Sequence, residues 1–386
     1  MHWFYAIFGA ALAAVWLDRL RDTALGLPTI PDLTQPQWDR APEGRPRVSI
    51  IVPARNEEEH VEAAVGSLLA LDYPDYEVIA VNDRSSDRTG EILDRLAREN
   101  PAHLRVLHVT ELPPGWLGKP HAMGLAAQQA TGDWLLFTDA DVTFRPDALR
   151  RALFCAQQSR ADHLVLFPTA IMHSLTERMM FGFFPLLVVF GHRPWKVSDP
   201  KTRDYIGMGA FNLIRRRVYE AVGAREALRM EVLDDMKLGK LVKEGGYAQR
   251  SAAGRSLVSL RWGRGALGVL DNLTKNLFAL MLYRWPRTLG AAFLLLVLNL
   301  GPFAGLALAP GWARLGYAMA VSAVALIYLC MSRYSLISPL YVVLHPISTA
   351  LFAFTLLRSM FLALGRGGVV WRGTKYPLEE LRKNLV

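Results

Sequence analysis

Short apolar segments alternate with amphipathic segments between residues 48 and 138, and this alternation constrains the fold more than any other feature of the chain. The apolar segments are bounded by polar or turn-forming residues and are too short for helices, so they predict strands. Strands are predicted over 48–52, 77–82, 104–109 and 134–138, with helices over 57–71, 87–99 and 120–130. Such alternation predicts an α/β fold whose mixed, mostly parallel sheet is covered by helices.

Carboxylates follow two of these predicted strands where each strand ends. Asp83 follows the strand over 77–82, and Asp139 and Asp141 follow the strand over 134–138. In open α/β sheets, ligands bind beyond the carboxyl ends of the strands. Two carboxylates one residue apart can hold a hard divalent cation, which can neutralise a diphosphate. Because Asp-x-Asp is also common in surface turns, the pair predicts a nucleotide-diphosphate site only together with its neighbours.

Two further polar clusters supply those neighbours. Residues 53–57, Pro-Ala-Arg-Asn-Glu, lead from the first strand into a helix whose N-terminus can face an anion. Asp234 and Asp235 open a helix predicted to run to residue 244. A carboxylate there can act as a general base, although either residue could simply cap the helix. Asp83 similarly could accept hydrogen bonds from a base or ribose, or cap a turn.

Long apolar stretches in the second half predict a membrane-bound protein. Hydrophobic residues make up 52% of the 386 residues and charged residues only 20%, which is low for a wholly soluble enzyme. Transmembrane helices are predicted over 289–309, 316–331 and 341–364. Residues 3–17 predict an uncleaved anchor with its N-terminus outside, in preference to a signal peptide, because no basic segment precedes them.

The order of these stretches leaves the membrane topology open. One span before the predicted sheet and three after it place the sheet and the basic tail on opposite sides, whereas the positive-inside rule favours both in the cytoplasm. One stretch, most readily 341–364, would then be re-entrant or interfacial. Arg358 inside it argues for packing against protein. The amphipathic segment 267–283 suits either a bilayer surface or the protein's own core.

The formal net charge of +9 limits the classes of partner. No zinc-finger spacing and no basic helix with heptads is present, so nucleic acid is not an expected partner. Basic residues between 366 and 383 fit a cytoplasmic membrane surface. The two cysteines suggest no disulfide framework, which suits a reducing compartment.

Taken together, these motifs resemble those of membrane-bound family 2 glycosyltransferases, which have the GT-A nucleotide-sugar fold. The resemblance covers roughly residues 45–262 and rests on VSIIVPARNE at 48–57, NDRSSD at 82–87, GKPHAM at 118–123 and TDAD at 138–141. The tail segment 367–373, GGVVWRG, resembles the lipid-modifying branches, namely ceramide, hopanoid and carotenoid glycosyltransferases.

The resemblance implies a role for each matching residue. The nucleotide donor would be bound by Pro53, Ala54, Arg55, Glu57 and Asp83. Asp139 and Asp141 would manage Mg²⁺ or Mn²⁺ and the diphosphate, with Asp141 as the more direct ligand. Lys119 would lie near the diphosphate or the acceptor; an exposed loop lysine is the alternative. Asp235 would be the catalytic base, with Asp234 in place of the family's usual Glu.

One family motif is incomplete. The Gln-x-x-Arg-Trp motif survives only as Arg261-Trp262, with Val258 at the Gln position. We expect Arg261 and Trp262 at the donor site, where they would bind the acceptor or gate the site, unless they only pack as a lid. The missing Gln weakens the interpretation as a processive polysaccharide synthase, whose product would be a polymer.

The sequence-based hypothesis is an inverting glycosyltransferase of the cytoplasmic membrane. It would move a sugar from a nucleotide-diphosphate donor, expected to be UDP-linked, to a lipid or polyprenoid acceptor, with its catalytic domain facing the cytoplasm. The alternatives are a processive synthase and a non-catalytic membrane-bound nucleotide-sugar sensor. The predicted divisions are an anchor (1–22), a linker (23–45), a GT-A domain (46–262), an interfacial helix (263–287), transmembrane helices (288–365) and a basic tail (366–386).

Overall fold

The structure, a computed structural model, describes residues 2–263 and 265–383, so the last three residues of the predicted basic tail lie outside the described chain. The chain forms two compact units, each built from segments that are distant in sequence. The sheet unit contains Ile30–Ile171, Pro194–Arg261 and the C-terminal segment from Glu379. The helical unit contains the chain up to Thr29, Met172–Arg193 and Trp262–Leu378.

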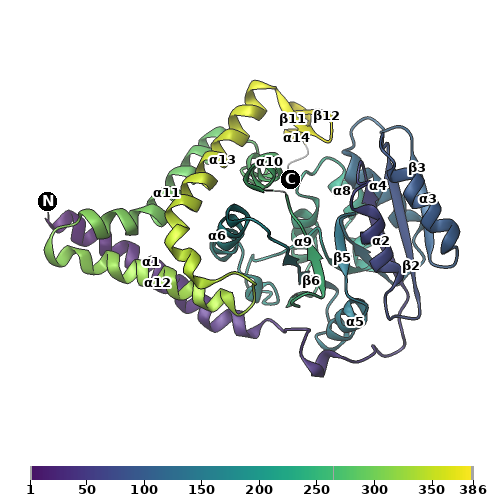
Figure 1. The fold of residues 1–386 in the computed structure, drawn as a ribbon, viewed down its shortest axis with the longest axis horizontal. Coiled ribbons are helices and arrows are strands. Elements are labelled where there is room, and N and C mark those ends of the chain that lie inside the picture. The colour runs from purple at the N-terminus through teal and green to yellow at the C-terminus, as the bar shows by residue number, and fades with distance from the viewer. Residues whose placement is uncertain (1, 264, 384–386) are drawn as a thin grey trace. The chain divides into compact units, whose positions relative to one another are not determined.

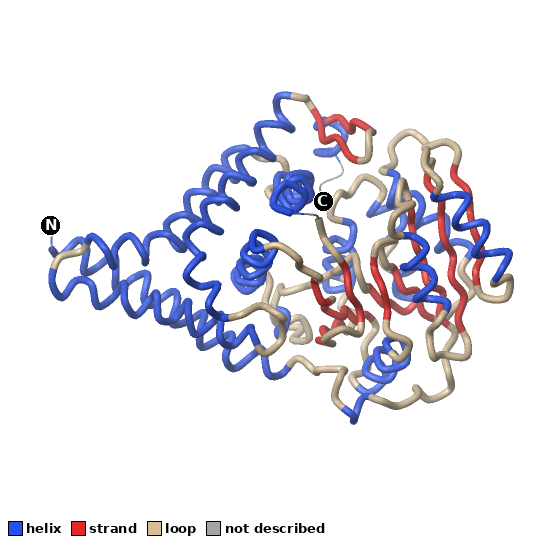
Figure 2. Tube along the Cα trace, in the orientation of Figure 1, coloured by secondary structure: helices blue, strands red, loops and turns tan. Residues whose placement is uncertain are grey.

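Seven strands of the described chain form the main sheet of the sheet unit, in the order β3-β2-β1-β4-β8-β6-β9. Strands are drawn in red in Figure 2. Strand β8 is antiparallel to both of its neighbours, and the other pairs are parallel. The predicted mixed, mostly parallel sheet is therefore confirmed. The strands are β1 (Val48–Ala54), β2 (Tyr76–Asp83), β3 (Leu104–Val109), β4 (Trp134–Phe137), β6 (His163–Phe167), β8 (Asn212–Arg215) and β9 (Gln249–Ala253).

Both faces of this sheet are buried, which explains why its strands are almost continuously apolar. Successive side chains point to opposite faces: Ile50 belongs to a buried apolar cluster with residues of α2, α3 and α5, whereas Ile51 belongs to a cluster with residues of α4, α7, α8 and α9. Figure 1 labels α2, α3, α4, α5, α8 and α9 around this sheet. The helices are α2 (Val61–Leu69), α3 (Thr89–Glu99), α4 (Gly118–Gln129), α5 (Ala148–Gln158), α7 (Arg216–Ala221), α8 (Ala224–Leu228) and α9 (Asp234–Glu244).

The register of the parallel strands brings their carboxyl ends to one edge. Val48 pairs with both Tyr76 and Trp134, so β1, β2 and β4 start level with one another. A small second sheet, in the order β5-β10-β7, continues from this edge, because β5 begins directly after Asp141. Its strands are β5 (Val142–Phe144), β7 (Thr169–Ala170) and β10 (Val258–Leu260).

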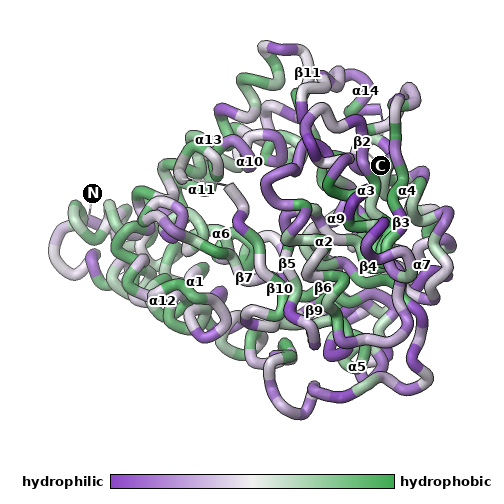
Figure 3. The backbone as a smooth tube through the Cα atoms, turned by 45° about the vertical axis from the view of Figure 1, so that its right-hand side comes forward, coloured by the Kyte–Doolittle hydropathy of each residue, from purple (hydrophilic) through white to green (hydrophobic). Residues whose placement is uncertain are grey.

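The helical unit contains the long apolar helices. In the described chain, four helical segments are long and apolar enough to cross a membrane: His2–Thr29, Trp285–Leu308, Gly311–Ser332 and Pro339–Gly365. Figure 3 colours much of their length as hydrophobic, and this indicates membrane association. The principal helices of the unit are α1 (His2–Gly26), α6 (Leu175–Gly191), α10 (Gly265–Leu280), α11 (Trp285–Leu308), α12 (Arg314–Ser332) and α13 (His345–Gly365).

Helix α1 is longer than the predicted 3–17 and packs along α12. Glycines allow the close approach, because a side chain at Gly316 would collide with the backbone of Gly9. The indole Nε1 of Trp16 donates a hydrogen bond to the Leu298 carbonyl of α11 over 2.8 Å. The first helix is therefore tied to two helices that lie almost 300 residues later.

Helix α10 is joined to α13 by polar contacts. The Arg358 guanidinium of α13 lies 2.8 Å from the Asp271 carboxylate of α10, so this arginine has a protein partner. Leu273 of α10 is buried, whereas Leu267 is 76% exposed, so one flank of the helix packs internally and the other does not. After α13, the predicted tail forms a hairpin, β11 (Gly368–Trp371) with β12 (Thr374–Pro377), and then α14 (Leu378–Lys383).

Candidate active site

A small cavity at the carboxyl edge of the main sheet gathers the charged residues of the site. Its walls come from the ends of β1 and β4 and the starts of α4, β8 and α9. It therefore brings together predicted residues from four separate motifs. The lining residues are Pro53, Lys119, Met123, Phe137, Thr138, Asp139, Gly209, Asn212, Asp234 and Asp235.

Lys119 lies between the carboxylates of this cluster. Its Nζ lies 2.8 Å from Oδ1 of Asp139 and 3.4 Å from Oδ2 of Asp234. Burial alone would lower the pKa of Lys119, but the nearby carboxylates outweigh burial and raise it. Lys119 is therefore a permanent cation among carboxylates rather than an exposed loop lysine.

Asp234 is the buried carboxyl of the cluster, with only 3% of the residue exposed. Burial raises its pKa from the usual 3.8 to about 7, the negative charges of Asp235 and Asp139 add to this, and Lys119 acts in the opposite direction. This carboxyl group consequently exchanges its proton near neutral pH.

Asp235 is oriented by backbone donors. Its Oδ2 accepts a hydrogen bond from Gly209 N–H over 2.8 Å, and its Oδ1 accepts one from Met236 N–H over 2.7 Å. The carbonyl of Gly209 in turn accepts from Asp139 N–H over 3.1 Å. Gly209 thus connects the two predicted functional carboxylates, although the sequence analysis did not single it out.

Gly209 has no room for a side chain. A Cβ there would lie 2.6 Å from Oδ2 of Asp139 and 3.6 Å from Nζ of Lys119. The glycines at 207 and 209, which flank Met208 shortly before β8, are the sequence signal that could have identified this close approach.

Asp139 and Asp141 lie in the turn between β4 and β5. Across the described chain, no group of three or more His, Cys, Asp or Glu side chains is placed to hold a metal ion unaided. Mg²⁺ is commonly held by one or two carboxylates together with substrate phosphates, and Mn²⁺ suits the same oxygen ligands. The two aspartates fit that chemistry, with the donor diphosphate supplying the remaining ligands. Asp141 is not among the residues that line the cavity.

The predicted nucleoside-binding residues come from two loops that are bonded to each other. Asn56, at a left-handed φ of 54°, donates its backbone N–H to Ser85 Oγ over 3.0 Å. Its side-chain Oδ1 accepts from Ser86 N–H over 2.8 Å. This pairing brings the segment from Ala54 to Glu57, which contains Arg55, against the loop that follows Asp83.

Asp83 itself is buried and already paired. Both of its carboxylate oxygens accept from the Arg84 guanidinium, over 2.7 and 3.0 Å. A base or ribose would therefore meet an Asp83–Arg84 pair rather than an isolated carboxylate.

Arg261 and Trp262 are not among the residues that line the cavity. Arg261 follows β10 directly, and the division between the two units falls after it. Trp262 packs edge-on against Phe181 of α6, with ring centroids 5.9 Å apart. Trp262 therefore has an aromatic packing partner within the helical unit, and its role at the donor site stays a prediction.

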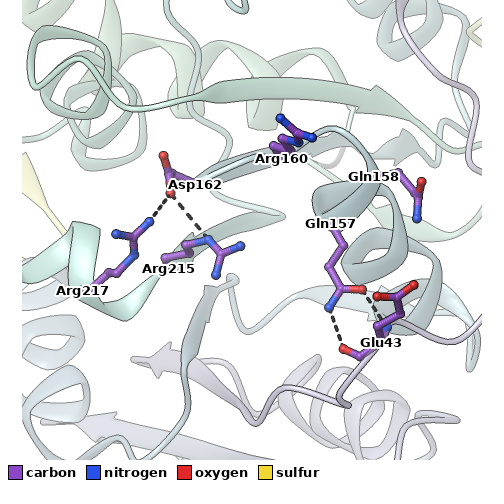
Figure 4. A pocket seen from close by; sticks show the side chains of 7 residues that line it. All are labelled: Glu43, Gln157, Gln158, Arg160, Asp162, Arg215 and Arg217. Atoms are coloured by element: carbon purple, nitrogen blue, oxygen red, sulfur yellow. Dashed lines mark hydrogen bonds and ion pairs between the residues drawn. The ribbon is translucent and has the colours of Figure 1, made fainter.

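A larger hollow of about 590 Å³ lies elsewhere in the sheet unit (Figure 4). Asp162 there binds both Arg215 and Arg217, at 3.5 and 3.0 Å. Arg215 also stacks over Trp134 at 4.6 Å, at the amino end of β4. Since the candidate site is at the carboxyl end of β4, this hollow is separate from it.

Comparison with known proteins now identifies the family. Residues 49–223 match the model of glycosyl transferase family 2. The chain belongs to glycosyltransferase family 2. The match contains Asp83, Lys119, Asp139 and Asp141, and it ends before Asp234. The predicted resemblance is confirmed, and the chain is an enzyme of this family.

This glycosyltransferase is similar to one protein in sequence and to another in solved structure. The 4,4'-diaponeurosporenoate glycosyltransferase of Staphylococcus aureus (strain USA300) is 26% identical over 348 residues, covering 86% of this chain and 89% of the relative. The solved mannosyltransferase PcManGT from Pyrobaculum calidifontis, in complex with GDP-Man and Mn²⁺, is 21% identical and has a TM-score of 0.56. That structure aligns with 92% of this chain and 99% of its own, which shows a shared GT-A-like fold with long apolar helices.

Proposed function

We propose that this glycosyltransferase transfers a sugar from a nucleotide-diphosphate donor to a membrane lipid, with inversion at the anomeric carbon. The carrying observation is the cavity that joins Lys119 and Asp139 to Asp234 and Asp235 at the carboxyl edge of the sheet. The long apolar helices of the same chain support a lipid acceptor. UDP is the donor nucleotide that we favour.

The donor side of the proposed reaction must neutralise a departing diphosphate. Asp139 and Asp141 would hold Mg²⁺ or Mn²⁺, which when bound supplies positive charge to the diphosphate oxygens. Lys119 supplies a fixed positive charge beside Asp139, only 2.8 Å away. Preorganised charge of this kind stabilises the negative charge that develops in the transition state.

The acceptor side needs a proton acceptor if a hydroxyl group attacks. Asp235 is the proposed base, and the Gly209 N–H holds one of its oxygens in place. A single displacement by the acceptor inverts the anomeric centre, and no nucleophile of the enzyme is required. Asp234, whose pKa is about 7, would adjust the charge around the base.

The chemistry of the acceptor decides how much the reaction depends on Asp235. The Staphylococcus aureus relative is named for diaponeurosporenoate, a carotenoid acid. An acid acceptor is already ionised at neutral pH and attacks without a base, whereas a lipid alcohol must lose its proton. We propose a hydrophobic polyprenoid or lipid acceptor. The effect of replacing Asp235 would show whether the attacking group of that acceptor is a carboxylate or a hydroxyl group.

The proposed orientation places the sheet unit on the cytoplasmic side of the membrane. Its support is the sequence pattern, in which Arg19 and Arg21 follow the apolar run over 3–17. Labelling of cysteines introduced at exposed positions of the sheet unit, in intact cells and in inverted vesicles, tests this orientation.

The test of the function uses the full chain in lipid nanodiscs with extracted membrane lipids, Mn²⁺ and radiolabelled UDP-glucose or GDP-mannose. We expect label to enter the organic phase as a product carrying one sugar. Asp141→Ala should reduce this transfer by at least about 100-fold, because it removes a proposed ligand of the diphosphate-bound cation. Asp94→Asn, at an exposed carboxylate paired with His108, is the control and should retain activity.

Two outcomes would overturn the proposal. Near-normal turnover of Asp141→Ala would exclude the metal-diphosphate role, and a polymeric product would favour a processive synthase. Asp235→Asn should reduce transfer to a lipid alcohol by about 100- to 10,000-fold, the usual range for a general base. Transfer to a carotenoid acid should be much less sensitive to the same substitution.

A further inference from the structure

A buried chain of polar side chains lies beside the candidate site in the sheet unit. Gln249 of β9 is only 1% exposed, and its Oε1 accepts from Ile206 N–H over 2.9 Å. Its Nε2 lies 3.1 Å from both the Ile206 carbonyl and the Gly239 carbonyl of α9. Because these partners are backbone groups of fixed polarity, they determine which end of the amide is oxygen and which is nitrogen.

The orientation of the Gln249 amide also determines which atoms donate and which accept at His163 and Asn212. Gln249 Nε2 also lies 2.8 Å from His163 Nδ1, so its two hydrogens are shared among three acceptors. Because an amide NH₂ group donates and does not accept, His163 Nδ1 is an acceptor and His163 Nε2 carries the imidazole hydrogen. That Nε2–H donates to Oδ1 of Asn212. Burial lowers the pKa of His163 to about 4, which is consistent with a neutral ring at neutral pH.

One end of this chain reaches the cavity. Asn212 pairs with Phe137 across β8 and β4, and both residues line the cavity together with Asp234. Since the Asn212 oxygen is taken by His163, the amide NH₂ is the end that remains for a ligand or carboxylate.

The other end holds the segment that orients Asp235. Residues 206–209 lie against α9 so closely that a side chain at Gly207 would collide with the Asp235 carbonyl. A side chain at Gly239 would collide with the Ile206 carbonyl. Gln249 bonds to both sides of this contact, at Ile206 and Gly239. Three residues after Ile206, Gly209 N–H binds Asp235.

We propose that His163 and Gln249 are positioning residues for sugar transfer: they hold segment 206–209 against α9 and present the Asn212 amide hydrogens to the cavity. This inference rests on the proposed function of Asp235, and it extends that function to residues that do not touch the substrate. Its consequence is that polar groups of the sheet interior set the geometry of the carboxylates. A displacement of catalytic groups by about 1 Å can cost about 100-fold in rate.

The test compares variants that differ in polarity more than in size. Gln249→Leu and His163→Leu remove the polar chain, whereas His163→Gln keeps one donor and one acceptor on the side chain. Ser49→Ala is the matched control, because Ser49 is also buried and bonds to Glu77 over 2.7 Å and to Gly132 N–H over 2.9 Å. It removes buried hydrogen bonds without touching segment 206–209.

Two measurements on the full chain distinguish positioning from stability. With UDP-glucose as the probe donor, both Leu variants should lower kcat by about 10- to 100-fold while KM changes less than about threefold. Hydrogen exchange should accelerate in peptides covering 206–212 but not in those covering β1 and β2. His163→Gln should recover most of kcat, and Ser49→Ala should leave kcat nearly unchanged even if its melting temperature falls equally.

The inference is overturned if the Leu variants lose no more kcat than Ser49→Ala at equal stability, or if segment 206–212 stays protected. Absence of transfer by the wild-type chain from both UDP-glucose and GDP-mannose would instead refute the proposed function. The exchange measurement still tests the contact between segment 206–209 and α9 in that case, so the two failures are distinguishable.

Discussion

Two carboxylates at opposite ends of the main sheet, the half-buried Glu77 and the buried Asp234, have opposite electrostatic environments. Glu77, near the amino end of β2, accepts hydrogen bonds from Ser49 Oγ, Thr131 N–H and Thr131 Oγ1 over 2.7–2.8 Å. Arg105 lies 3.5 Å from its other oxygen. Asp234, at the carboxyl edge, faces Lys119 at 3.4 Å and shares that cation with Asp139.

The two environments shift the pKa in opposite directions. Burial acts to raise the pKa of both carboxyl groups, but the hydrogen bonds to Glu77 bring its pKa below the usual value. The pKa of Asp234 rises to about 7, because burial, together with the negative charges of Asp235 and Asp139, outweighs the opposing effect of Lys119. The comparison shows that the hydrogen bonds of the fold stabilise the Glu77 carboxylate. Asp234 instead lies among other carboxylates, and a bound cationic ligand could reduce their mutual repulsion.

The largest effect is expected when the cation is removed from the carboxylate cluster at the carboxyl edge of the sheet. Lys119→Met should reduce sugar transfer by at least about 100-fold, because the diphosphate loses a preorganised positive charge. Lys119→Arg should retain part of the activity. Arg105→Met, which removes the cation near Glu77, should leave transfer unchanged. Equal losses in the Lys119 and Arg105 variants would show that the contrast between the two ends has no functional meaning.

A smaller effect is expected when the Asp139 carboxylate is shifted but the charges of the cluster are kept. Gly209→Ala should lower transfer by about tenfold, because its Cβ would lie 2.6 Å from Asp139 Oδ2 and push that carboxylate away. Thermal stability should change little, since the end of a side chain can move. Gly66→Ala in α2, where no atom lies within 4 Å of the new Cβ, should stabilise the fold by about 0.5–1 kcal/mol. Unimpaired transfer by Gly209→Ala would contradict the tight geometry.

The smallest expected effect is on the pH dependence of stability. The pKa of Asp234 is about 7 in the folded chain and near its usual 3.8 when unfolded, so the folded state binds more protons between these values. Stability from this group therefore falls as pH rises from about 4 to about 7. Glu77 has the opposite sign: its contribution is present above its usual 4.5 and is lost as pH falls.

Melting curves at pH 5 and pH 7.5 measure this difference. The loss of melting temperature between the two values should be a few degrees smaller in Asp234→Asn than in the wild type. Glu77→Gln should not reduce that loss. An unchanged pH dependence in Asp234→Asn would mean that the carboxyl group titrates normally.

Strands β1 to β4 of the main sheet were predictable because β1, β2 and β4 are dense in β-branched and aromatic residues. Strands β6 and β9 of the same sheet were not predicted. The start of α2 was not predictable either, and the predicted start at residue 57 was wrong. Residues 57–60 form a turn instead, and Glu57 N–H binds Thr89 Oγ1 over 2.8 Å. The two- and three-residue strands β5, β7 and β10 were also missed, since distant pairing rather than local sequence defines them.

The same distinction applies to the site. The carboxylates could be predicted because they follow apolar strands or open a helix, although their catalytic roles stay predictions. Gly209, Asn212 and the polar chain behind them could not. Gln249 and His163 are separated by 86 residues, and the role of each side chain depends on its contact with the other. Local propensity carries no information about such a contact.

The contact between Trp16 and Leu298 has a consequence for biosynthesis. The two residues are 282 positions apart, so at about 5–20 residues per second the ribosome needs on the order of 15–60 s to supply the second. During that interval α1 has left the ribosome without the helices that cover its glycine face and accept its indole hydrogen bond. A stalled or truncated chain would present this surface to lipid or to the membrane insertion machinery. Helix α1 is therefore synthesised long before the helices that are its native partners.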